Sequence, residues 1–409
     1  MPVASIVIPC YNASLYVSQT IDSACKQTEQ DLEIICVDDG STDDTLSILH
    51  KKAELDTRIK VFTQQNAGEG PACEYGRTQA HGRWLYFLDS DDLMESTLIE
   101  KAVAQGEATR ADMVIFKTRE LDNQTGELRS FYWSFVTDWL QAPKGVSELV
   151  GKTGVDRIVL DGMSGVFSPR EHPERIFNSF QNWVRNKLFR KSFVDARHLV
   201  FQPVHRTADL LFVCRALAEA DRIALLDEEL HQYRVNNTAS ALFTSDSYPL
   251  DFYDAFCELK DSLEKQGTWT LYRDSFVNWV QEGVAMNLQR ARSYEGFMQI
   301  VHTMRDENGL ARLGFLQSSR STAINPDRWD RCYAILHSST EELLFLYFSL
   351  ERAEVMRAQT QNSQQRLDIR HAYETCRPMR IGKAVARFID RPGISNAVRV
   401  LHIKKLFGL

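Results

Sequence analysis

The sequence predicts an α/β fold with a mainly parallel sheet, covered by helices on both faces and followed by a helical C-terminal region. In the first 120 residues, short and almost wholly apolar runs alternate with segments of helical periodicity. Such runs are typical of parallel strands that are buried on both sides. From about residue 248 onward helical periodicity dominates, for example in Phe252, Phe256, Leu259 and Leu263.

Four strands and three helices are predicted in the N-terminal part. The apolar runs that predict strands are Ser5–Ile8, Leu32–Val37, Ile59–Thr63 and Trp84–Leu88. Helices are expected at about residues 14–27, after Ser41, and from about 70 to 81. Ser41 is predicted as the N-cap of its helix, with Asp43 and Asp44 in the first turn, where negative charge is favourable.

The next part of the chain is less regular. Between about residues 121 and 175 aromatic residues accumulate among scattered Gly, Pro and Ser, which indicates an elaborated substrate-side region rather than a linker. Regular patterns return from about 179 to 237. We therefore predict a first domain at 1–245, with halves 1–120 and 121–245, and a helical region at 246–409.

The composition limits the class of protein. The chain has 409 residues, of which 44% are hydrophobic and 25% charged, which excludes wholesale disorder. Its formal net charge of −7 argues against a general nucleic-acid binder. The eight cysteines show no CxxC pair, and the first residues show no secretory signal. No apolar stretch is long enough to span a membrane, so we expect a cytoplasmic protein.

Acidic residues follow two of the predicted strands. Asp38 and Asp39 come after the second strand, and Asp89 and Asp91 come after the fourth. In open parallel sheets, ligands bind at the carboxyl ends of the strands. Carboxylates there suit Mg²⁺ or Mn²⁺, or the imide N–H of a pyrimidine. The alternatives are a solvated acidic turn and an acidic helix N-terminus.

These segments, with the strand that precedes them, resemble the family 2 glycosyltransferases. The resemblance rests on Ser5–Asn12, Glu33–Asp43, Asn66–Gly68 and Phe87–Asp92, which stand in the expected order and spacing. It implies a GT-A fold, a nucleotide-diphospho-sugar donor that we expect to be a UDP-sugar, and a Mn²⁺ or Mg²⁺ ion. It also implies inversion at the anomeric carbon.

Carried over position by position, the resemblance implies a set of site residues. Pro9, Tyr11 and Asp39 would line the base pocket, Asp89 would lie by the ribose and diphosphate, and Asp91 would bind the metal together with Asp89. The whole predicted nucleotide-sugar site comprises Pro9, Tyr11, Asn12, Asp38, Asp39, Asn66, Gly68, Asp89, Ser90 and Arg234.

Further segments match the family more weakly. Trp183–Phe189 and Ala208–Phe212 are similar to segments of bacterial non-processive members, in which the position of Asp209 is that of the catalytic base. The alternative for Asp209 is a helix cap or a surface acid. Tyr233–Ser240 resembles a closing strand and loop, where Arg234 would meet phosphate or form a structural salt bridge.

Two positions depart from the family pattern. Ala208 stands where an acidic residue is usual, which leaves Asp209 as the carboxylate for proton abstraction there. Cys73-Glu74 replaces the usual Arg-Asn before Gly76, which removes a cation near the nucleotide. Compensation by Arg77 or Arg83 is one hypothesis.

The C-terminal tail, residues 377–409, is basic and amphipathic. Its cations are Arg377, Arg380, Lys383, Arg387, Arg391, Arg399, Lys404 and Lys405. Two hypotheses explain it: peripheral docking on the anionic inner face of a membrane, and packing against an acidic face of this chain or of a sister subunit in a homo-oligomer.

Together these features predict an inverting, metal-assisted glycosyltransferase acting on a glycan or a lipid-linked acceptor. The alternatives are a catalytically degenerate scaffold of a polysaccharide synthase complex and a sugar nucleotidyltransferase. The nucleotidyltransferase is disfavoured because no Gly-rich, Lys-bearing loop follows the first strand.

Overall fold

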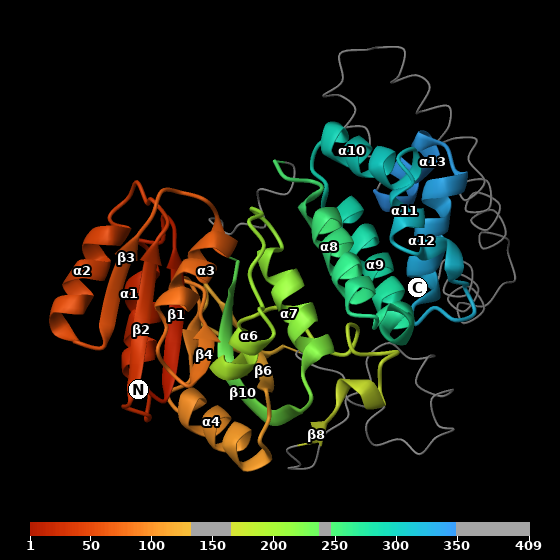
Figure 1. Cartoon of the computed structure of the whole chain (residues 1–409). Coiled ribbons are helices and arrows are strands. Elements are labelled where there is room, and N and C mark those ends of the chain that lie inside the picture. Colours follow the sequence, from red (N-terminus) through yellow and green to blue (C-terminus); the bar gives the residue numbers. More distant parts are fainter. Residues whose placement is uncertain (132–164, 237–246, 349–409) are drawn as a thin grey trace, which may run out of the picture. The chain divides into compact units, whose positions relative to one another are not determined.

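The computed structural model describes residues 1–131, 165–236 and 247–348 (Figure 1). The chain divides into two compact units. The first contains the described residues up to 236 together with Asp251–Trp279, and the second contains 247–250 and the described residues from Val280 onward. Residues 237–246, where the predicted domain boundary lies, are outside the described residues, so that boundary stays a prediction.

The first unit alternates strands and helices, as predicted. Its strands are β1 (Ala4–Cys10), β2 (Leu32–Asp38), β3 (Ile59–Thr63), β4 (Trp84–Phe87), β5 (Leu93–Met94), β6 (Met113–Asp122), β7 (Leu128–Ser130), β8 (Val166–Phe167), β9 (Lys187–Arg190) and β10 (Ile223–Val235). Its helices are α1 (Val17–Cys25), α2 (Thr45–Leu55), α3 (Glu69–Gln79), α4 (Leu98–Thr109), η2 (Pro169–Glu171), α6 (Lys191–Ala196), α7 (Ala208–Glu219) and α8 (Asp251–Lys265).

The strands form one mixed sheet in the order β3-β2-β1-β4-β9-β6-β10-β5. The first four of these strands are parallel, and so are β6 and β10. Strand β9 runs antiparallel between β4 and β6, while β7 pairs with β6 and β8 with β10, both antiparallel. The mainly parallel arrangement therefore holds for the N-terminal half, and the second half is mixed.

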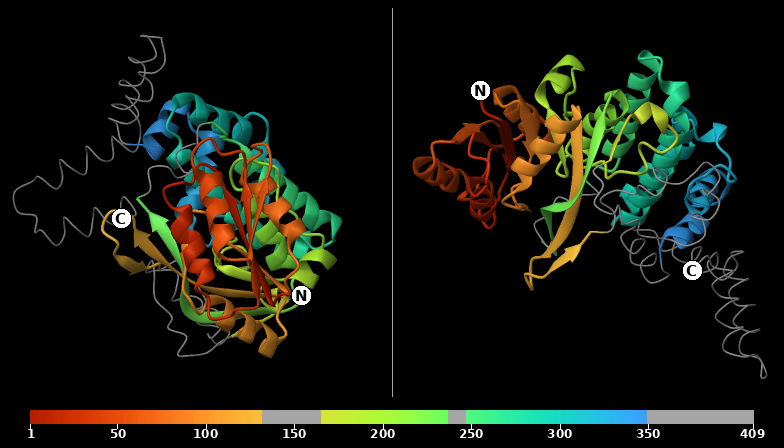
Figure 2. Two further views of the ribbon diagram at one scale, coloured as in Figure 1. Left: turned by 90° about the vertical axis from the view of Figure 1, so that its left-hand side faces the viewer. Right: turned by 90° about the horizontal axis from the view of Figure 1, so that it is seen from below.

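Both faces of the parallel strands are buried, which explains why these strands lack polar alternation. On one face, Ile6 and Ile8 of β1 pack in a core with Ile21 of α1, Leu49 of α2 and Leu98 of α4. On the other face, aromatic rings from four segments meet: the Phe87 ring centroid lies 4.9 Å from that of Phe201 and 5.7 Å from that of Phe212, and the Phe189 and Phe212 centroids are 5.1 Å apart. Helices thus cover the sheet on two sides (Figure 2).

One predicted helix start is wrong. Helix α2 begins at Thr45 rather than after Ser41. The Ser41 hydroxyl accepts a hydrogen bond from the backbone N–H of Asn12 (3.0 Å), and Asp43 accepts one from the N–H of Ser14 (3.1 Å). These side chains join the loops after β1 and β2 instead of capping a helix.

The described residues from 247 to 348 are mainly helical, as predicted. Helix α9 (Trp269–Arg290) continues from the first unit into the second, which contains α10 (Tyr294–Arg305), α11 (Gly309–Arg312), η4 (Phe315–Gln317), α12 (Pro326–His337) and α13 (Thr340–Tyr347). The periodic residues Phe252, Phe256, Leu259 and Leu263 are all buried. Within the described residues, every helix is too short or too polar to cross a bilayer. The tail at 377–409 lies outside the described residues.

Candidate active site

The loops that follow β1, β2 and β4 carry most of the predicted site residues. The three strands are parallel neighbours in register, with Cys10 of β1 opposite Asp38 of β2 and Val7 opposite Phe87 of β4. Their carboxyl ends therefore meet at one edge of the sheet, where ligands of such sheets bind.

Asp39 organises the loop after β3. Its buried carboxylate accepts hydrogen bonds from the Gln64 side chain (2.8 Å) and from the backbone N–H groups of Ala67 (2.9 Å) and Gly68 (2.8 Å). Gly68 has φ +98°, a conformation that favours glycine. A carboxylate has about four acceptor sites, so Asp39 retains capacity for one further donor.

The other predicted base-pocket residues lie close to Asp39 in the chain or in the neighbouring loop. Pro9 is half-buried in β1, Tyr11 is 51% exposed, and Asn66 is exposed in the loop that Asp39 holds. Asn12 adopts φ +48°, and its side-chain oxygen accepts a hydrogen bond from the backbone N–H of Thr42 (2.8 Å). The binding role of these residues stays a prediction.

Asp38 differs from its neighbour in its bonding. Its Oδ2 accepts a weak hydrogen bond from the N–H of Ser41 at 3.3 Å. Its Oδ1 is buried and has no hydrogen-bond partner among the described residues. A buried acceptor without a donor is unfavourable, so this atom is suited to receive a ligand hydroxyl.

An acidic cluster follows β4. Oxygen atoms of Asp89, Asp91 and Asp92 all lie within 4.8 Å of one another. Ser90, between the first two, is half-buried, and its carbonyl accepts a hydrogen bond from the Thr20 hydroxyl (2.9 Å). The loop is thereby attached to α1, which restrains the cluster.

Asp92 is the fully buried member of the cluster. It accepts hydrogen bonds from the backbone N–H of Arg234 (2.8 Å), from Nε2 of His231 (3.0 Å) and from Arg185 (3.3 Å). The other ring nitrogen of His231 lies 2.8 Å from the hydroxyl of Tyr86. Burial lowers the pKa of His231 to about 3, so the ring is neutral and links Tyr86 to Asp92. These contacts give His231 a structural role.

Arg185 is a functional candidate that sequence reasoning missed. Its Nη1 lies 2.9 Å from Asp89 and 3.3 Å from Asp92, and its guanidinium lies 4.7 Å from the ring centroid of Trp183 and 4.8 Å from that of Tyr233. Burial disfavours the charged form, but Asp89 and Asp92 outweigh it, and the pKa of Arg185 is raised above its ordinary value. The sequence feature that could have identified Arg185 is its place in the Trp183–Phe189 segment, which resembles the family.

Asp209 lies in the first turn of α7 and faces the same cluster. Its carboxylate accepts a hydrogen bond from the N–H of Val184 (3.4 Å). Desolvation raises the pKa of Asp209 to about 6, with Asp89 adding to the shift and Arg185 opposing it. Asp209 is not the N-cap of α7, which is Thr207, and it is half-buried rather than an exposed surface acid. Its place near Asp89 is compatible with the predicted role as a base, which stays a prediction.

Glu69 is a second residue that the sequence analysis did not select. It begins α3 and keeps solvent-accessible surface. Desolvation raises the pKa of its carboxyl, and the negative charges of Asp89 and Asp209 raise it further. The shifts place Glu69, Asp89 and Asp209 in one electrostatically linked group.

The two departures from the family pattern have local explanations. A Cβ added at Gly70 would lie 2.1 Å from the carbonyl oxygen of Gln202 and 2.7 Å from the Cβ of Ala208. The start of α3 therefore passes directly against the start of α7, and a small residue at 208 fits that contact. Cys73 is buried.

The arginines expected to compensate for Cys73-Glu74 are engaged elsewhere. Arg77 pairs with Glu74 (2.6 Å) and Asp195 (3.2 Å). Arg83 lies 4.0 Å from Glu107, beside the start of β4, whereas the acidic cluster follows its end. Arg185 forms ion pairs with carboxylates of the acidic cluster, whereas the Arg234 side chain donates to the backbone carbonyl of Asp91.

Arg234 is buried and joins several segments. Its side chain donates to the carbonyl of Asp91 (2.6 Å), to Asn123 (3.0 Å) and to Gln19 (3.1 Å). These contacts favour the structural alternative for Arg234 over the contact with phosphate.

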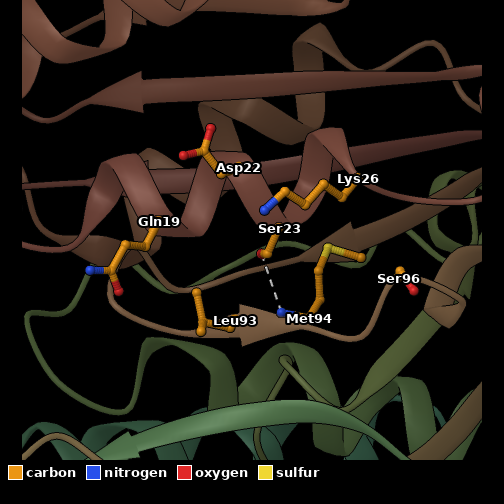
Figure 3. Close-up of a pocket in the computed structure, with 7 residues that line it drawn as sticks. All are labelled: Gln19, Asp22, Ser23, Lys26, Leu93, Met94 and Ser96. Atoms are coloured by element: carbon orange, nitrogen blue, oxygen red, sulfur yellow. Dashed lines mark hydrogen bonds between the residues drawn. The ribbon is translucent and has the colours of Figure 1, made fainter. Parts of the chain in front are cut away.

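A pocket of about 320 Å³ lies between α1 and the segment around β5 (Figure 3). Gln19, Asp22, Ser23 and Lys26 of α1 line one side of it, and Leu93, Met94 and Ser96 line the other. None of the predicted site residues lines this pocket, so we do not assign the donor to it.

Residues 5–165 match the family model described as glycosyl transferase family 2. The match is limited to this part of the chain, which is similar to the family 2 glycosyltransferases. The chain is 28% identical over 243 residues to an uncharacterized glycosyltransferase, EpsJ, of Bacillus subtilis. The alignment covers 58% of this chain and 62% of that protein. An uncharacterized glycosyltransferase of Haemophilus influenzae is 41% identical over 102 residues, covering 25% of this chain and 41% of that protein. The chain thus spans less than two thirds of these relatives.

The fold of this chain is also found in a solved structure. The crystal structure of S. aureus TarS 1–349 in complex with UDP aligns with a TM-score of 0.54 and 19% identity, covering 88% of this chain and 92% of that one. This likeness shows the GT-A fold that the resemblance implied.

Proposed function

We propose that the chain transfers a sugar, with inversion, from a nucleotide-diphospho-sugar to a glycan or lipid-linked acceptor. The observation that carries this proposal is the position of Asp209, on α7, facing the acidic cluster after β4. A base and a cluster of carboxylates that can hold a metal are the two charged parts that such a transfer needs. A UDP-sugar is the proposed donor, because Asp39 is available to accept from a pyrimidine imide and TarS is described in complex with UDP.

The donor set of the acidic cluster suits a divalent metal. Asp89 and Asp91 offer carboxylate oxygens, which Mn²⁺ and Mg²⁺ prefer. Asp92 already accepts three hydrogen bonds, so Asp91 and Asp89 are the proposed ligands. A bound metal would neutralise charge on the leaving diphosphate.

Asp209 is proposed as the general base. Its pKa of about 6 lies just below neutral pH, so the carboxylate is ionised there and still basic enough to take a proton from an acceptor hydroxyl. The backbone N–H of Val184 orients it.

Calorimetric titration of UDP, GDP, dTDP and CDP, each with and without Mn²⁺, tests the donor site. We expect wild type to bind UDP or dTDP in a metal-dependent manner and Asp91→Ala to lose the metal dependence. Asp195→Ala is the matched control, because Asp195 is an acid of the same unit that pairs with Arg77 and Lys191. Absence of binding by every nucleotide would leave the scaffold alternative as the better account.

A further inference from the structure

The acidic group at the ends of β4 and α7 contains more negative than positive charge. Asp89, Asp91 and Asp92 lie together, and the charge of Asp89 also acts on Asp209 and Glu69. Carboxylates crowded in this way repel one another at low effective dielectric. A cation held beside these carboxylates offsets this repulsion when no metal is bound.

Arg185 is the cation in position to do so. It contacts Asp89 at 2.9 Å and Asp92 at 3.3 Å. It also lowers the pKa of Glu69 and Asp209, against the upward effect of desolvation. The side chain is 16% exposed, so solvent screens these interactions only in part.

The surroundings hold the guanidinium in place. It packs against the rings of Trp183 and Tyr233, which also contact each other, and such contact with aromatic faces suits arginine better than lysine. Asp92 is itself restrained by His231 and by the backbone of Arg234. The position of Arg185 is therefore determined by segments from three parts of the sheet.

The guanidinium retains capacity for another partner. Its Nε is buried and has no hydrogen-bond acceptor within the described part of the chain. A buried donor without an acceptor is unfavourable, and arginine with free N–H groups is well suited to phosphate oxygens. The arginines at 77 and 83 have other partners.

We propose that Arg185 is the resident counter-cation of the donor site, which neutralises Asp89 and Asp92 before a metal binds and then contacts the donor diphosphate. It takes the place of the cation that Cys73-Glu74 lacks. The contact with the donor diphosphate rests on the proposed function. The neutralisation of Asp89 and Asp92 does not, because it concerns only the metal and the carboxylates.

Calorimetric titration with Mn²⁺ alone tests the counter-cation role, and titration with UDP alone tests the contact with the diphosphate. In Arg185→Gln we expect Mn²⁺ to bind at least about fivefold more tightly, because a competing positive charge has been removed from its carboxylate ligands. We expect metal-free UDP to bind about tenfold more weakly, because a charged hydrogen-bond donor has been lost. Arg185→Lys should restore most of the wild-type Mn²⁺ affinity but only part of the UDP affinity.

Arg190→Gln is the matched control. Arg190 also stacks on a tryptophan, with its guanidinium 4.3 Å from the Trp84 ring, and pairs with Glu107. It lies opposite Trp84, at the start of β4, whereas the acidic cluster follows the end of that strand. Neither affinity should change in this variant.

Several outcomes decide the proposal. Unchanged or weaker Mn²⁺ binding by a folded Arg185→Gln protein, checked by its circular dichroism and thermal melt, would overturn it. Should that variant not fold, a UDP affinity of Arg185→Lys equal to wild type would overturn the diphosphate contact. Failure of the wild type to bind any nucleotide would refute the proposed function instead, and the Mn²⁺ titrations would still decide on the counter-cation.

Discussion

Single residues in the active-site region depend on partners that are distant in the sequence. His231 links the hydroxyl of Tyr86 to the carboxylate of Asp92, and all three groups are buried. Removing the imidazole in His231→Ala takes the hydrogen-bond partner from the buried Tyr86 hydroxyl and one of three hydrogen bonds from Asp92. We therefore expect the free energy of unfolding to fall by about 2–4 kcal/mol. Tyr86→Phe should cost about 1 kcal/mol.

Urea denaturation followed by fluorescence measures these changes. The control is His50→Ala, because His50 is exposed on α2 and should change stability little. Equal losses in His231→Ala and His50→Ala would contradict a structural role for the buried link.

The charge state of Asp209 predicts a pH dependence. Its folded-state pKa is raised to about 6, so the carboxyl gains a proton as the pH falls through 6 and can no longer act as a base. We expect kcat/KM for transfer to decline about tenfold per pH unit below that value. Asp209→Asn should lose about 100- to 10,000-fold in kcat and the acid limb with it.

The raised pKa also has a consequence for stability. A carboxyl whose pKa is higher in the folded state destabilises that state when it is ionised, so this contribution makes folding less favourable above pH 6 and is relieved below about pH 4. Asp209→Asn should therefore be at least as stable as wild type at pH 7 by thermal melting. Retained transfer activity in this variant would refute the base assignment.

At the scale of elements, α3 and α7 approach closely at Gly70. A Cβ there would meet the backbone oxygen of Gln202 at 2.1 Å, so a larger residue forces the start of α3 away from α7. We expect Gly70→Ala to lose about 1–3 kcal/mol of stability, as overpacking does. It should also weaken UDP binding, because Gly68 and Asp39 belong to the same loop contact.

Gly165→Ala is the matched control, because a Cβ at Gly165 would meet nothing within 4 Å. Thermal melts and UDP titration of both variants provide the comparison. A Gly70→Ala protein with wild-type stability and affinity would show that the two helices are free to separate.

At the scale of the whole molecule, docking of the basic tail at 377–409 on an anionic membrane remains a prediction. We expect the full chain to bind vesicles that contain anionic phosphatidylserine, with each nearby cation contributing about 1 kcal/mol. Replacing Arg380, Lys383, Arg387 and Arg391 by Gln should reduce flotation strongly, and added salt should do the same to wild type. Flotation that is unchanged in the variant would favour the alternative, in which the tail packs on protein.

The sequence by itself determined the parallel part of the fold. Strands Leu32–Val37 and Ile59–Thr63 were found with nearly their observed bounds, because strands buried on both faces are apolar throughout. The family followed from short segments around Asp39 and Asp89, because loops at strand ends carry their ligand-binding side chains locally.

Only the tertiary structure decided which groups meet. The antiparallel β9 brings Trp183 and Arg185 to the acidic cluster, and no local pattern encodes a contact across 93 residues such as that between Arg185 and Asp92. The same holds for Ser41, whose hydroxyl joins two loops instead of capping a helix. Local sequence specifies periodicity and turn chemistry, whereas the partner of a buried charge depends on how distant segments pack.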